Sequence, residues 1–156
     1  MTVKIAINGF GRIGRCVLRA LIESQNSDLE VVAINDLASP ETLVHLLKYD
    51  SIHGRLGAPA KLEGDTLEIG RHCIRITAER NPENLPWGDV DIAFESTGIF
   101  TSRKDAARHL QNGSKRVLIS APGAGADRTI VYGVNHEDLC TSDRVVSNAS
   151  CTTNCL

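Results

Sequence analysis

The chain has 156 residues, of which 42% are hydrophobic and 23% charged, and its formal net charge is −2. A chain of this length and composition can form one globular domain with a substantial core. The small net charge gives no reason to expect nucleic acid or a membrane surface as a partner. No apolar run approaches the roughly 18 residues that a membrane helix needs.

The cysteines argue against a disulfide framework and against a zinc site. Their number is odd, their spacing is irregular and no Cys-x-x-Cys pair occurs. This usage favours a reducing cytoplasm, and the first expected strand begins so early, at Val3, that no room is left for a signal peptide. We therefore expect a cytoplasmic protein without a bound metal, in which Cys16 and Cys73 are buried packing residues.

The chain opens with a strand, a glycine loop and a helix. The apolar run 3–8 predicts a strand, and Gly9-Phe10-Gly11-Arg12-Ile13-Gly14 follows it. A helical pattern comes next, with apolar residues at Ile13, Cys16, Val17, Ala20 and Leu21. A second apolar run, 31–35, ends at Asp36. This order and length are typical of a dinucleotide-binding βαβ unit.

Each residue type in this pattern has a chemical reason. Gly9 permits a tight turn, Gly11 lacks a Cβ and lets a pyrophosphate approach the backbone, and Gly14 lets the helix pack close to the sheet. The first amides of the helix are unpaired and carry a partial positive charge for the phosphates. A carboxylate at Asp36 accepts hydrogen bonds from ribose hydroxyls and repels a 2′-phosphate. The pattern therefore favours NAD over NADP.

The next segment is expected to be a helix that begins at Ser39-Pro40, because serine caps a helix and proline suits its first turn. It carries Leu43, Leu46 and Leu47 inward and ends near residues 48–49. Residues 60–77 then alternate between apolar and polar, which predicts short antiparallel strands.

The remaining elements indicate the fold class. Strands are expected at 91–95, 116–120, 129–134 and 144–147, with a helix at 102–112 that Gly113 ends. Strands that alternate with helices and are apolar on both faces indicate an α/β protein. We expect a Rossmann-type, doubly wound, mainly parallel sheet with a short antiparallel addition.

In such sheets a ligand lies at the carboxyl ends of the strands. The residues at these ends are all small or polar: Asn8-Gly9, Asn35-Asp36, Ser96-Thr97-Gly98 and Ser120-Ala121-Pro122. As a set they favour a cofactor site along this edge.

A cysteine near the end of the chain has the setting of a nucleophile. Cys151 follows a strand and begins an expected helix, within Ser147-Asn148-Ala149-Ser150-Cys151-Thr152-Thr153-Asn154. A helix N-terminus stabilises a thiolate, and a thiolate is the reactive form of cysteine. The local sequence alone is equally compatible with a small buried thiol at a strand–helix junction.

Motifs along the whole chain resemble the phosphorylating glyceraldehyde-3-phosphate dehydrogenases. They are Ile5-Ala6-Ile7-Asn8-Gly9-Phe10-Gly11-Arg12-Ile13-Gly14-Arg15, Leu46-Leu47-Lys48-Tyr49-Asp50-Ser51-Ile52-His53-Gly54, Glu95-Ser96-Thr97-Gly98-Ile99-Phe100, Ile119-Ser120-Ala121-Pro122, Gly133-Val134-Asn135 and Ser147 to Asn154. The last of these is similar to the family's active-site signature. On this resemblance Cys151 is the catalytic nucleophile.

The resemblance also implies the roles of the other site residues. The cofactor site comprises Gly9, Gly11, Arg12, Ile13, Gly14, Asp36, Arg80, Thr97 and Ser120. Arg12 and Ile13 hold the pyrophosphate through their backbone amides, Arg80 borders the adenine, and Ser120 lies on the nicotinamide side. Ser150 and Thr152 flank Cys151 and help to bind substrate and phosphate. The family's usual Glu-Arg-Asp-Pro reads Glu79-Arg80-Asn81-Pro82 here, with the arginine kept.

The implied activity is the NAD-dependent oxidation and phosphorylation of glyceraldehyde 3-phosphate to 1,3-bisphosphoglycerate, with inorganic phosphate, through a cysteine thioester. Residues 1–148 would form the NAD-binding domain and residues 149–156 would begin a catalytic domain. The rest of that domain would supply a histidine base that none of the five histidines here matches. We therefore expect the 156-residue chain alone to be inactive and the full-length protein to be a homotetramer.

Three alternatives remain open. Erythrose-4-phosphate dehydrogenase shares the fold and the cysteine signature. A non-catalytic NAD-binding module would keep the glycine loop without needing the nucleophile. A semialdehyde dehydrogenase also combines a Rossmann half with a thioester cysteine, although in a different sequence context.

Overall fold

The structure, a computed structural model, describes residues 2–24 and 27–156. In chain order its elements are β1 (Val3–Asn8), α1 (Arg12–Ser24), β2 (Leu29–Asn35), α2 (Pro40–Lys48), β3 (Tyr49–Asp50), β4 (Gly54–Arg55), β5 (Ala60–Glu63), β6 (Thr66–Ile69), β7 (His72–Thr77), the 3₁₀ turn η1 (Pro82–Asn84), β8 (Ile92–Glu95), α3 (Arg103–Ala106), α4 (Arg108–Gln111), β9 (Arg116–Ile119), β10 (Arg128–Thr129), the 3₁₀ turn η2 (His136–Asp138), β11 (Val145–Ser147) and α5 (Cys151–Cys155).

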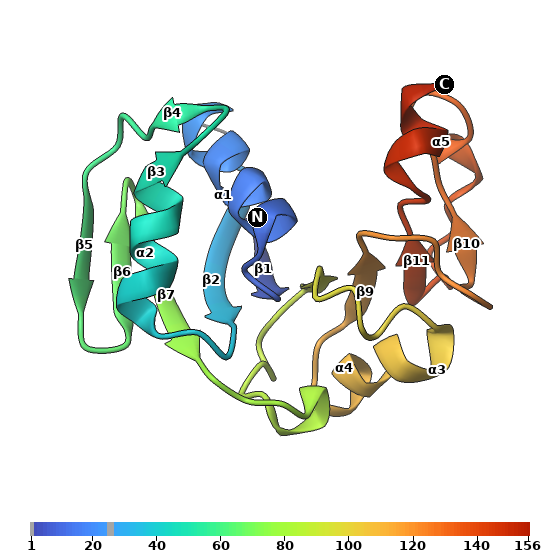
Figure 1. Cartoon of the computed structure of the whole chain (residues 1–156). Coiled ribbons are helices and arrows are strands. Elements are labelled where there is room, and N and C mark those ends of the chain that lie inside the picture. Colours follow the sequence, from blue (N-terminus) through green and yellow to red (C-terminus); the bar gives the residue numbers. More distant parts are fainter. Residues whose placement is uncertain (1, 25–26) are drawn as a thin grey trace.

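Within the described residues, nine strands form one sheet in the order β10-β11-β9-β8-β1-β2-β7-β6-β5 (Figure 1). Strands β5 and β6 are antiparallel additions at one edge, and the pairs from β7 to β10 are parallel. The chain builds outward from β1 to β2 and β7, then returns to the other side of β1 and adds β8, β9 and β11. The expected doubly wound α/β fold is therefore confirmed, and its topological switch point lies between β1 and β8.

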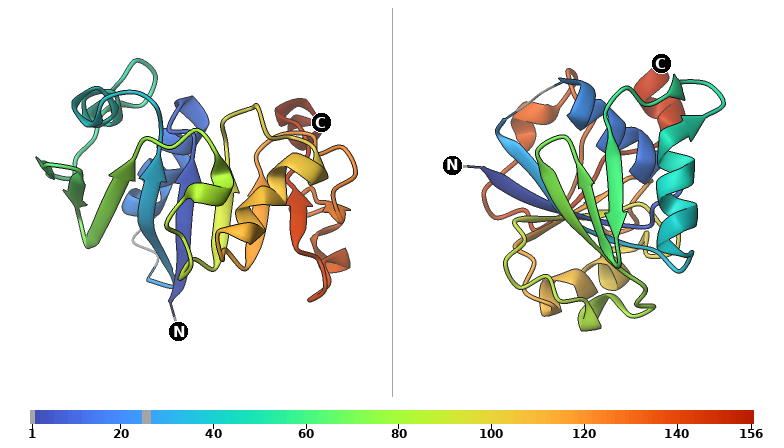
Figure 2. Two further views of the ribbon diagram at one scale, coloured as in Figure 1. Left: turned by 90° about the horizontal axis from the view of Figure 1, so that it is seen from below. Right: turned by 90° about the vertical axis from the view of Figure 1, so that its left-hand side faces the viewer.

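The two faces of the sheet are covered by different elements (Figure 2). Ile5 and Ile7 of β1 pack with α1 and α2 in one apolar cluster, whereas Ala6, which points to the opposite face, belongs to a second cluster around Trp87 and Ala106. Because successive side chains of a strand alternate between faces, both clusters are built from the same strands. Burial on both faces explains why the central strands have near-continuous apolar sequences.

Helix α2 forms where its capping residues predict it. The Ser39 side chain accepts a hydrogen bond from the Thr42 amide at 3.3 Å, and Pro40 occupies the first turn. Its inward face, however, is made by Leu43, Val44 and Leu47, while Leu46 is 39% exposed. The prediction for Leu46 was therefore wrong.

Helix α1 also presents a different face from the one its apolar residues suggest. Gly14, Leu18 and Leu21 are buried against the sheet, whereas Ile13 is 51% exposed and Ala20 is exposed as well. The glycine sets this orientation, because the helix can approach the sheet most closely where a side chain is absent.

Strand β7 forms within the segment predicted to hold antiparallel strands, but it pairs parallel with β2 on one side and antiparallel with β6 on the other. Cys73 on this strand is exposed and not a packing residue. The buried positions of β7 are His72, Ile74 and Ile76. A strand alternates strictly, so once the two isoleucines face the core the cysteine between His72 and Ile74 must face outward. Cys16, on α1, is partly buried.

Two further predictions fail in the second half of the chain. The strand expected at 129–134 is limited to β10, because the backbone after Thr129 turns and the Asn135 side chain accepts the Val131 amide hydrogen at 2.8 Å. The helix expected at 102–112 is divided at Ala107 into α3 and α4. Its Ser102 cap is nevertheless observed, and Gly113 follows it with a φ of 102°.

No helix in residues 2–24 and 27–156 combines the length and the apolar character needed to cross a membrane.

Candidate functional site

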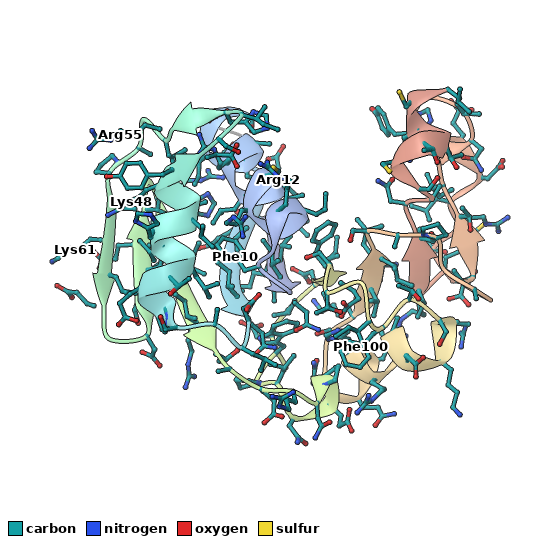
Figure 3. The ribbon with its side chains drawn as sticks, in the orientation of Figure 1. Phe10, Arg12, Lys48, Arg55, Lys61 and Phe100 are labelled. Atoms are coloured by element: carbon teal, nitrogen blue, oxygen red, sulfur yellow. The ribbon has the colours of Figure 1, made fainter. Side chains whose placement is uncertain are left out.

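A crevice of about 470 Å³ opens at the carboxyl ends of β1, β2 and β8. It is lined by Asn8, Gly9, Gly11, Asn35, Asp36, Leu37, Glu79, Arg80, Ser96, Thr97, Ile99 and Phe100. Figure 3 places Arg12, at the start of α1, and Phe100, beyond β8, on opposite sides of the switch point. This is where open α/β sheets bind their ligands.

The glycines of the loop differ in what surrounds them. A Cβ on Gly9, whose φ is +86°, would lie 2.6 Å from the Thr97 amide nitrogen, and a Cβ on Gly14 would lie 2.4 Å from the carbonyl oxygen of Gly9. A Cβ on Gly11 would meet nothing within 4 Å. The first and third glycines are thus required by the fold, whereas the space beside Gly11 is free for a ligand.

The first turn of α1 presents backbone amides, and not the Arg12 guanidinium, to a ligand. The first intrahelical bond runs from the Arg15 amide to the Gly11 carbonyl at 3.1 Å, so the amides of Arg12 and Ile13 precede it without intrahelical partners. The Arg12 guanidinium is turned to Asp50, with Nη1 3.1 Å from Oδ2. Backbone amides of His53 and Ile52, together with Arg12, lower the pKa of Asp50 to about 2, so this ion pair is present at neutral pH.

Asp36 connects β2 to the glycine loop. Its Oδ2 accepts the Phe10 amide hydrogen at 2.7 Å and its Oδ1 accepts the Ala38 amide hydrogen at 3.0 Å. Each carboxylate oxygen can accept more than one hydrogen bond, so the side chain retains acceptor capacity toward the crevice that it lines. The structure therefore adds a loop-positioning contact to the residue predicted to bind ribose.

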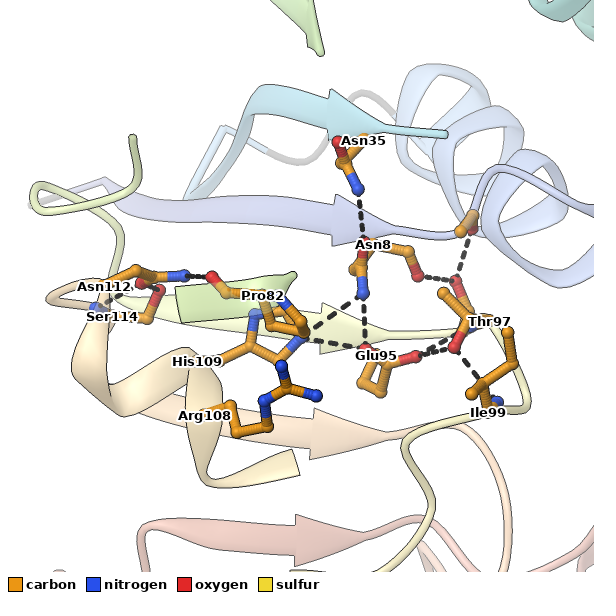
Figure 4. A network of polar contacts seen from close by, with 12 residues as sticks. Asn8, Asn35, Pro82, Glu95, Thr97, Ile99, Arg108, His109, Asn112 and Ser114 are labelled. Atoms are coloured by element: carbon orange, nitrogen blue, oxygen red, sulfur yellow. Dashed lines mark hydrogen bonds and ion pairs between the residues drawn. The ribbon is translucent and has the colours of Figure 1, made fainter. Parts of the chain in front are cut away.

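Beneath the crevice lies a buried polar network that the sequence analysis did not anticipate (Figure 4). Asn35 donates to Asn8, Asn8 donates to Glu95, and Glu95 contacts His109 at 2.8 Å. Glu95 and His109 are 1% and 0% exposed, respectively. A glutamate that ends an otherwise apolar strand was the available signal, since such a residue is rarely buried without a partner.

Thr97 lines the crevice, but its hydrogen-bond donors already bond to the protein itself. Its amide and its hydroxyl both donate to Oε1 of Glu95, at 2.9 and 2.5 Å. Its hydroxyl oxygen then accepts the Ile99 amide hydrogen at 3.1 Å. Thr97 can therefore offer a ligand acceptors but not these donors.

The cysteine motif forms a separate region at the end of β11. Cys151 is the first residue of α5 and is exposed. Ser150 caps this short helix by accepting the Thr153 amide hydrogen at 3.0 Å, and its hydroxyl lies 2.8 Å from that of Thr152. The three residues predicted to act together are therefore adjacent, but the crevice lining does not include them. Cys151 is therefore not the small buried thiol that the local sequence also allowed.

A strained backbone precedes this cysteine. Ala149 is the one non-glycine residue with a positive φ, +58°, in the part of the chain that the structure describes. The left-handed conformation costs alanine about 1–2 kcal/mol, and such residues concentrate at functional sites. The Ser147 hydroxyl accepts the Ala149 amide hydrogen at 3.1 Å and holds the turn in place.

The predicted site residues all follow the carboxyl ends of strands of the same sheet. Each is assigned to the strand that it follows, and in spatial order these are Arg80 after β7, Asp36 after β2, the glycine loop after β1, Thr97 after β8, Ser120 after β9 and Cys151 after β11. This spatial order differs from the order in the chain. Among the described residues no cluster of histidine, cysteine and acidic side chains suits a metal ion.

A doubly wound sheet with a glycine loop, an open position at Gly11 and an acid at the end of β2 defines a dinucleotide-binding domain of the Rossmann type. A protein-family model described as "Glyceraldehyde 3-phosphate dehydrogenase, NAD binding domain" matches residues 3–103. The chain belongs to this family.

Similar proteins of known name agree with this assignment. The chain is 64% identical over 156 residues to a glyceraldehyde-3-phosphate dehydrogenase of Cereibacter sphaeroides, covering 100% of this chain and 47% of that protein. Identity is 63% to the Xanthobacter flavus protein of the same name and 57% to that of Geobacillus stearothermophilus, again with 100% of this chain and 47% of the relative covered. The chain thus spans about half the length of these curated relatives.

Proposed function

We propose that the crevice binds NAD as the cofactor half of a phosphorylating glyceraldehyde-3-phosphate dehydrogenase. The observation that carries this proposal is the order of the site residues along the sheet edge. An adenosine contact, a ribose acceptor, a phosphate loop and a nucleophile succeed one another in the order in which an extended dinucleotide and its substrate would meet them.

The adenosine half is assigned to the end of the crevice at β2 and β7. Leu37, after β2, and Ile99, after β8, contribute apolar walls to the crevice, with exposed fractions of 54% and 74%, and Arg80 lies at its border. Large exposed apolar side chains suit the flat face of an adenine, because the base would remove them from water. The free acceptor capacity of Asp36 suits the ribose hydroxyls.

The pyrophosphate is assigned to the space beside Gly11 and to the amides of Arg12 and Ile13. Gly9 and Gly14 shape this loop without needing to touch the ligand. Thr97 lines the crevice at the end of β8, and Ser120, at the end of β9, is proposed to border the nicotinamide half. Because β9 lies between β8 and β11, this half would point toward Cys151.

In the proposed reaction the Cys151 thiolate adds to the aldehyde carbon of glyceraldehyde 3-phosphate. Bound NAD supplies a hydride acceptor, and the carbon then remains attached to sulfur as a thioester. Inorganic phosphate attacks the thioester, the sulfur leaves and 1,3-bisphosphoglycerate is released. Ser150 and Thr152 are proposed to orient the substrate and phosphate beside the sulfur.

We further propose that residues 1–148 constitute the NAD-binding domain and residues 149–156 the start of the catalytic domain. In this proposal the full-length protein is a cytoplasmic homotetramer. The proposal rests on the family assignment and on the relatives' greater length.

Calorimetry with NAD and NADP tests the cofactor assignment. We expect binding of NAD and little or no binding of NADP by the full-length protein. Equal affinity for both dinucleotides, or affinity for neither, would refute it. Side-by-side turnover of glyceraldehyde 3-phosphate and erythrose 4-phosphate then decides between the two sugar phosphates.

Alkylation tests the nucleophile. Limited treatment with iodoacetamide followed by mass mapping should modify Cys151 faster than Cys16 or Cys73. Cys73 is the stricter comparison, since it is exposed like Cys151 but lies within a strand. Equal rates at Cys73 and Cys151 would remove the evidence for an activated thiol.

A further inference from the structure

The crevice has two walls that come from distant parts of the chain. The segment after β7 contributes Glu79 and Arg80, and the turn after β8 contributes Ile99 and Phe100. Strands β1 and β2 separate β7 from β8 in the sheet, and both walls lie beyond the last residues of their strands. The spacing of the two walls is therefore set by contacts outside the strand ladder.

Arg108, on α4, contacts both walls with one guanidinium group. Its Nε and Nη2 donate to the two carboxylate oxygens of Glu83 at 2.7 and 2.8 Å, which is a bidentate pair. Glu83 belongs to η1, which follows Arg80 closely in the chain. The guanidinium carbon also lies 5.3 Å from the centroid of the Phe100 ring, within the range of a cation–π contact.

Helix α4 holds the first wall at a second point. Asn112, four residues after Arg108, donates from Nδ2 to the Pro82 carbonyl oxygen at 2.8 Å (Figure 4). Nη2 of Arg108 lies 3.4 Å from Oδ1 of Asn81, a longer contact to the same segment. Loss of Arg108 would thus leave η1 attached to α4 through Asn112 and would release its connection to the Phe100 ring.

The pair of Arg108 and Glu83 lies at the surface, with side chains 29% and 34% exposed. The bond between them lowers the pKa of Glu83 and raises that of Arg108, so both are charged at neutral pH. An ion pair this exposed contributes little to the stability of a fold. Its removal should therefore change the spacing of the walls more than it changes the unfolding free energy.

We propose that Arg108 is a positioning residue for the adenosine half of the dinucleotide, because it joins Glu83 to Phe100 and so holds the two walls of the crevice at a fixed spacing. This inference rests on the proposed function. It extends that function to a side chain that does not line the crevice. Walls that are held before the ligand arrives spare the cost of ordering them on binding.

Arg108→Leu in the full-length protein tests this role by calorimetry and steady-state kinetics. We expect NAD and AMP, which carries only the adenosine half, both to bind about fivefold more weakly. KM for NAD should rise by the same factor while kcat stays within about twofold, because the lost contact acts on binding and not on the reacting atoms. Arg108→Lys keeps the charge but loses the bidentate fork, so its effect should be intermediate.

Two further variants separate the bridge from a general loss of positive charge. Arg103→Leu removes a partly exposed arginine of the neighbouring helix α3, whose partner Asp127 does not line the crevice. It should leave the affinities for NAD and AMP as in the wild type. Glu83→Gln should weaken both ligands, and combining it with Arg108→Leu should add little, because the two residues act as one unit.

A fluorine label on the Phe100 ring gives a readout that needs no ligand. Its resonance, assigned with Phe100→Leu, should shift in Glu83→Gln, which reaches the ring through Arg108, and should stay unchanged in Arg103→Leu. Unchanged NAD and AMP affinities in Arg108→Leu, an equal loss in Arg103→Leu, or a fall in kcat without a rise in KM would overturn the inference. If the wild type binds neither ligand, the proposed function has failed, and the resonance still decides whether Arg108 joins the two walls.

Discussion

The cofactor crevice and the cysteine loop are built in different ways. The crevice rests on long central strands whose ends are tied together by buried side chains, with Glu95 and His109 almost fully buried. The cysteine loop follows β11, a strand of three residues, and places Cys151 exposed on a helix of five residues. The bonds around Cys151 come from its own neighbours in sequence.

This difference shows which part of the chemistry the chain can organise by itself. The crevice brings together residues from four strand ends, those of β1, β2, β7 and β8, and buried side chains hold its rims from below. The cysteine has a capped helix and a strained alanine, but no side chain from a distant segment is recorded against its sulfur among the described residues. In the proposed function, cofactor binding would therefore depend on the sheet, and the reactivity of Cys151 would depend on further groups.

The largest expected effect distinguishes two glycines of the same loop. Gly9→Ala would place a methyl group 2.6 Å from the backbone of Thr97 at a φ of +86°, so it should prevent the switch point from forming. Gly11→Ala meets no protein atom within 4 Å. It should leave the thermal midpoint unchanged and still weaken NAD binding, by about tenfold or more, because the methyl group displaces a phosphate from the amides.

Thermal unfolding and calorimetry on the two glycine variants check this prediction. A Gly11→Ala protein that binds NAD as tightly as the wild type would contradict the assignment of the pyrophosphate to this loop. A stable Gly9→Ala protein would contradict the close crossing of the loop and β8.

The next effect concerns the carboxylate beside the loop. Asp36→Ala should weaken NAD by about tenfold, since a charged acceptor of hydrogen bonds is lost, and should relax the exclusion of NADP. Asp36→Asn keeps one acceptor oxygen for the Phe10 or Ala38 amide and should bind NAD better than the alanine variant. Unchanged calorimetric affinities for both dinucleotides in Asp36→Ala would reject the ribose role.

A smaller effect separates the two regions by pH. His72, on β7, accepts the Val31 amide hydrogen at Nδ1. Burial of the imidazole and, to a smaller extent, the charge of Arg71 lower the pKa of His72 below 6.5, while Glu30 acts in the opposite direction. The unfolded chain therefore binds a proton that the folded chain does not. Stability should fall as the pH drops through 6.5, by at most about 1.4 kcal/mol per pH unit.

Urea unfolding at pH 7.5 and 5.5 measures this loss, and His72→Asn, which retains an acceptor near Nδ1, should flatten it. Asp127 provides a contrast, because Arg103 and the amides of Val145 and Arg144 lower its pKa to about 2. Its contribution is lost only as the pH falls toward 2, well below this window. An equal pH slope in His72→Asn and the wild type would exclude the histidine as the cause.

The smallest effect is expected at the strained residue before the cysteine. Ala149→Gly relieves about 1 kcal/mol of left-handed strain but removes a buried methyl group worth about 0.8 kcal/mol. The two terms nearly cancel, so the unfolding free energy should rise by no more than about 0.5 kcal/mol. A clear loss of stability by thermal unfolding would show that the methyl contacts matter more than the strain.

The sequence predicted the elements whose pattern is locally complete. The glycine loop, the Ser39 cap and the alternating strands at 60–77 each carry their own signal, and each forms where expected. The fold class followed, because alternation of strands and helices leaves few topologies.

The failures share a different origin. Cys73 lies outside the core because the parity of β7 is set by its isoleucines, and Leu46 is exposed because α2 rotates to bury Val44 instead. The turn after Thr129 depends on the side chain of Asn135. In each case the outcome is decided by a partner that sequence periodicity does not reveal.

The candidate site divides in the same way. Residues with a motif, such as Asp36 and Cys151, could be named from the sequence. The pairing of Glu95 with His109 could not, because the two residues meet only once α4 is packed against β8.

The ion pair between Arg12 and Asp50 has a consequence for how the coenzyme's charge would be met. With the guanidinium turned away, the diphosphate would be stabilised by peptide dipoles, whose field extends only over the first helical turn. Long-range attraction would then contribute little, and added electrolyte should scarcely alter affinity. Recognition would depend on fit at close range, so polyanions lacking the correct shape would gain nothing from this loop.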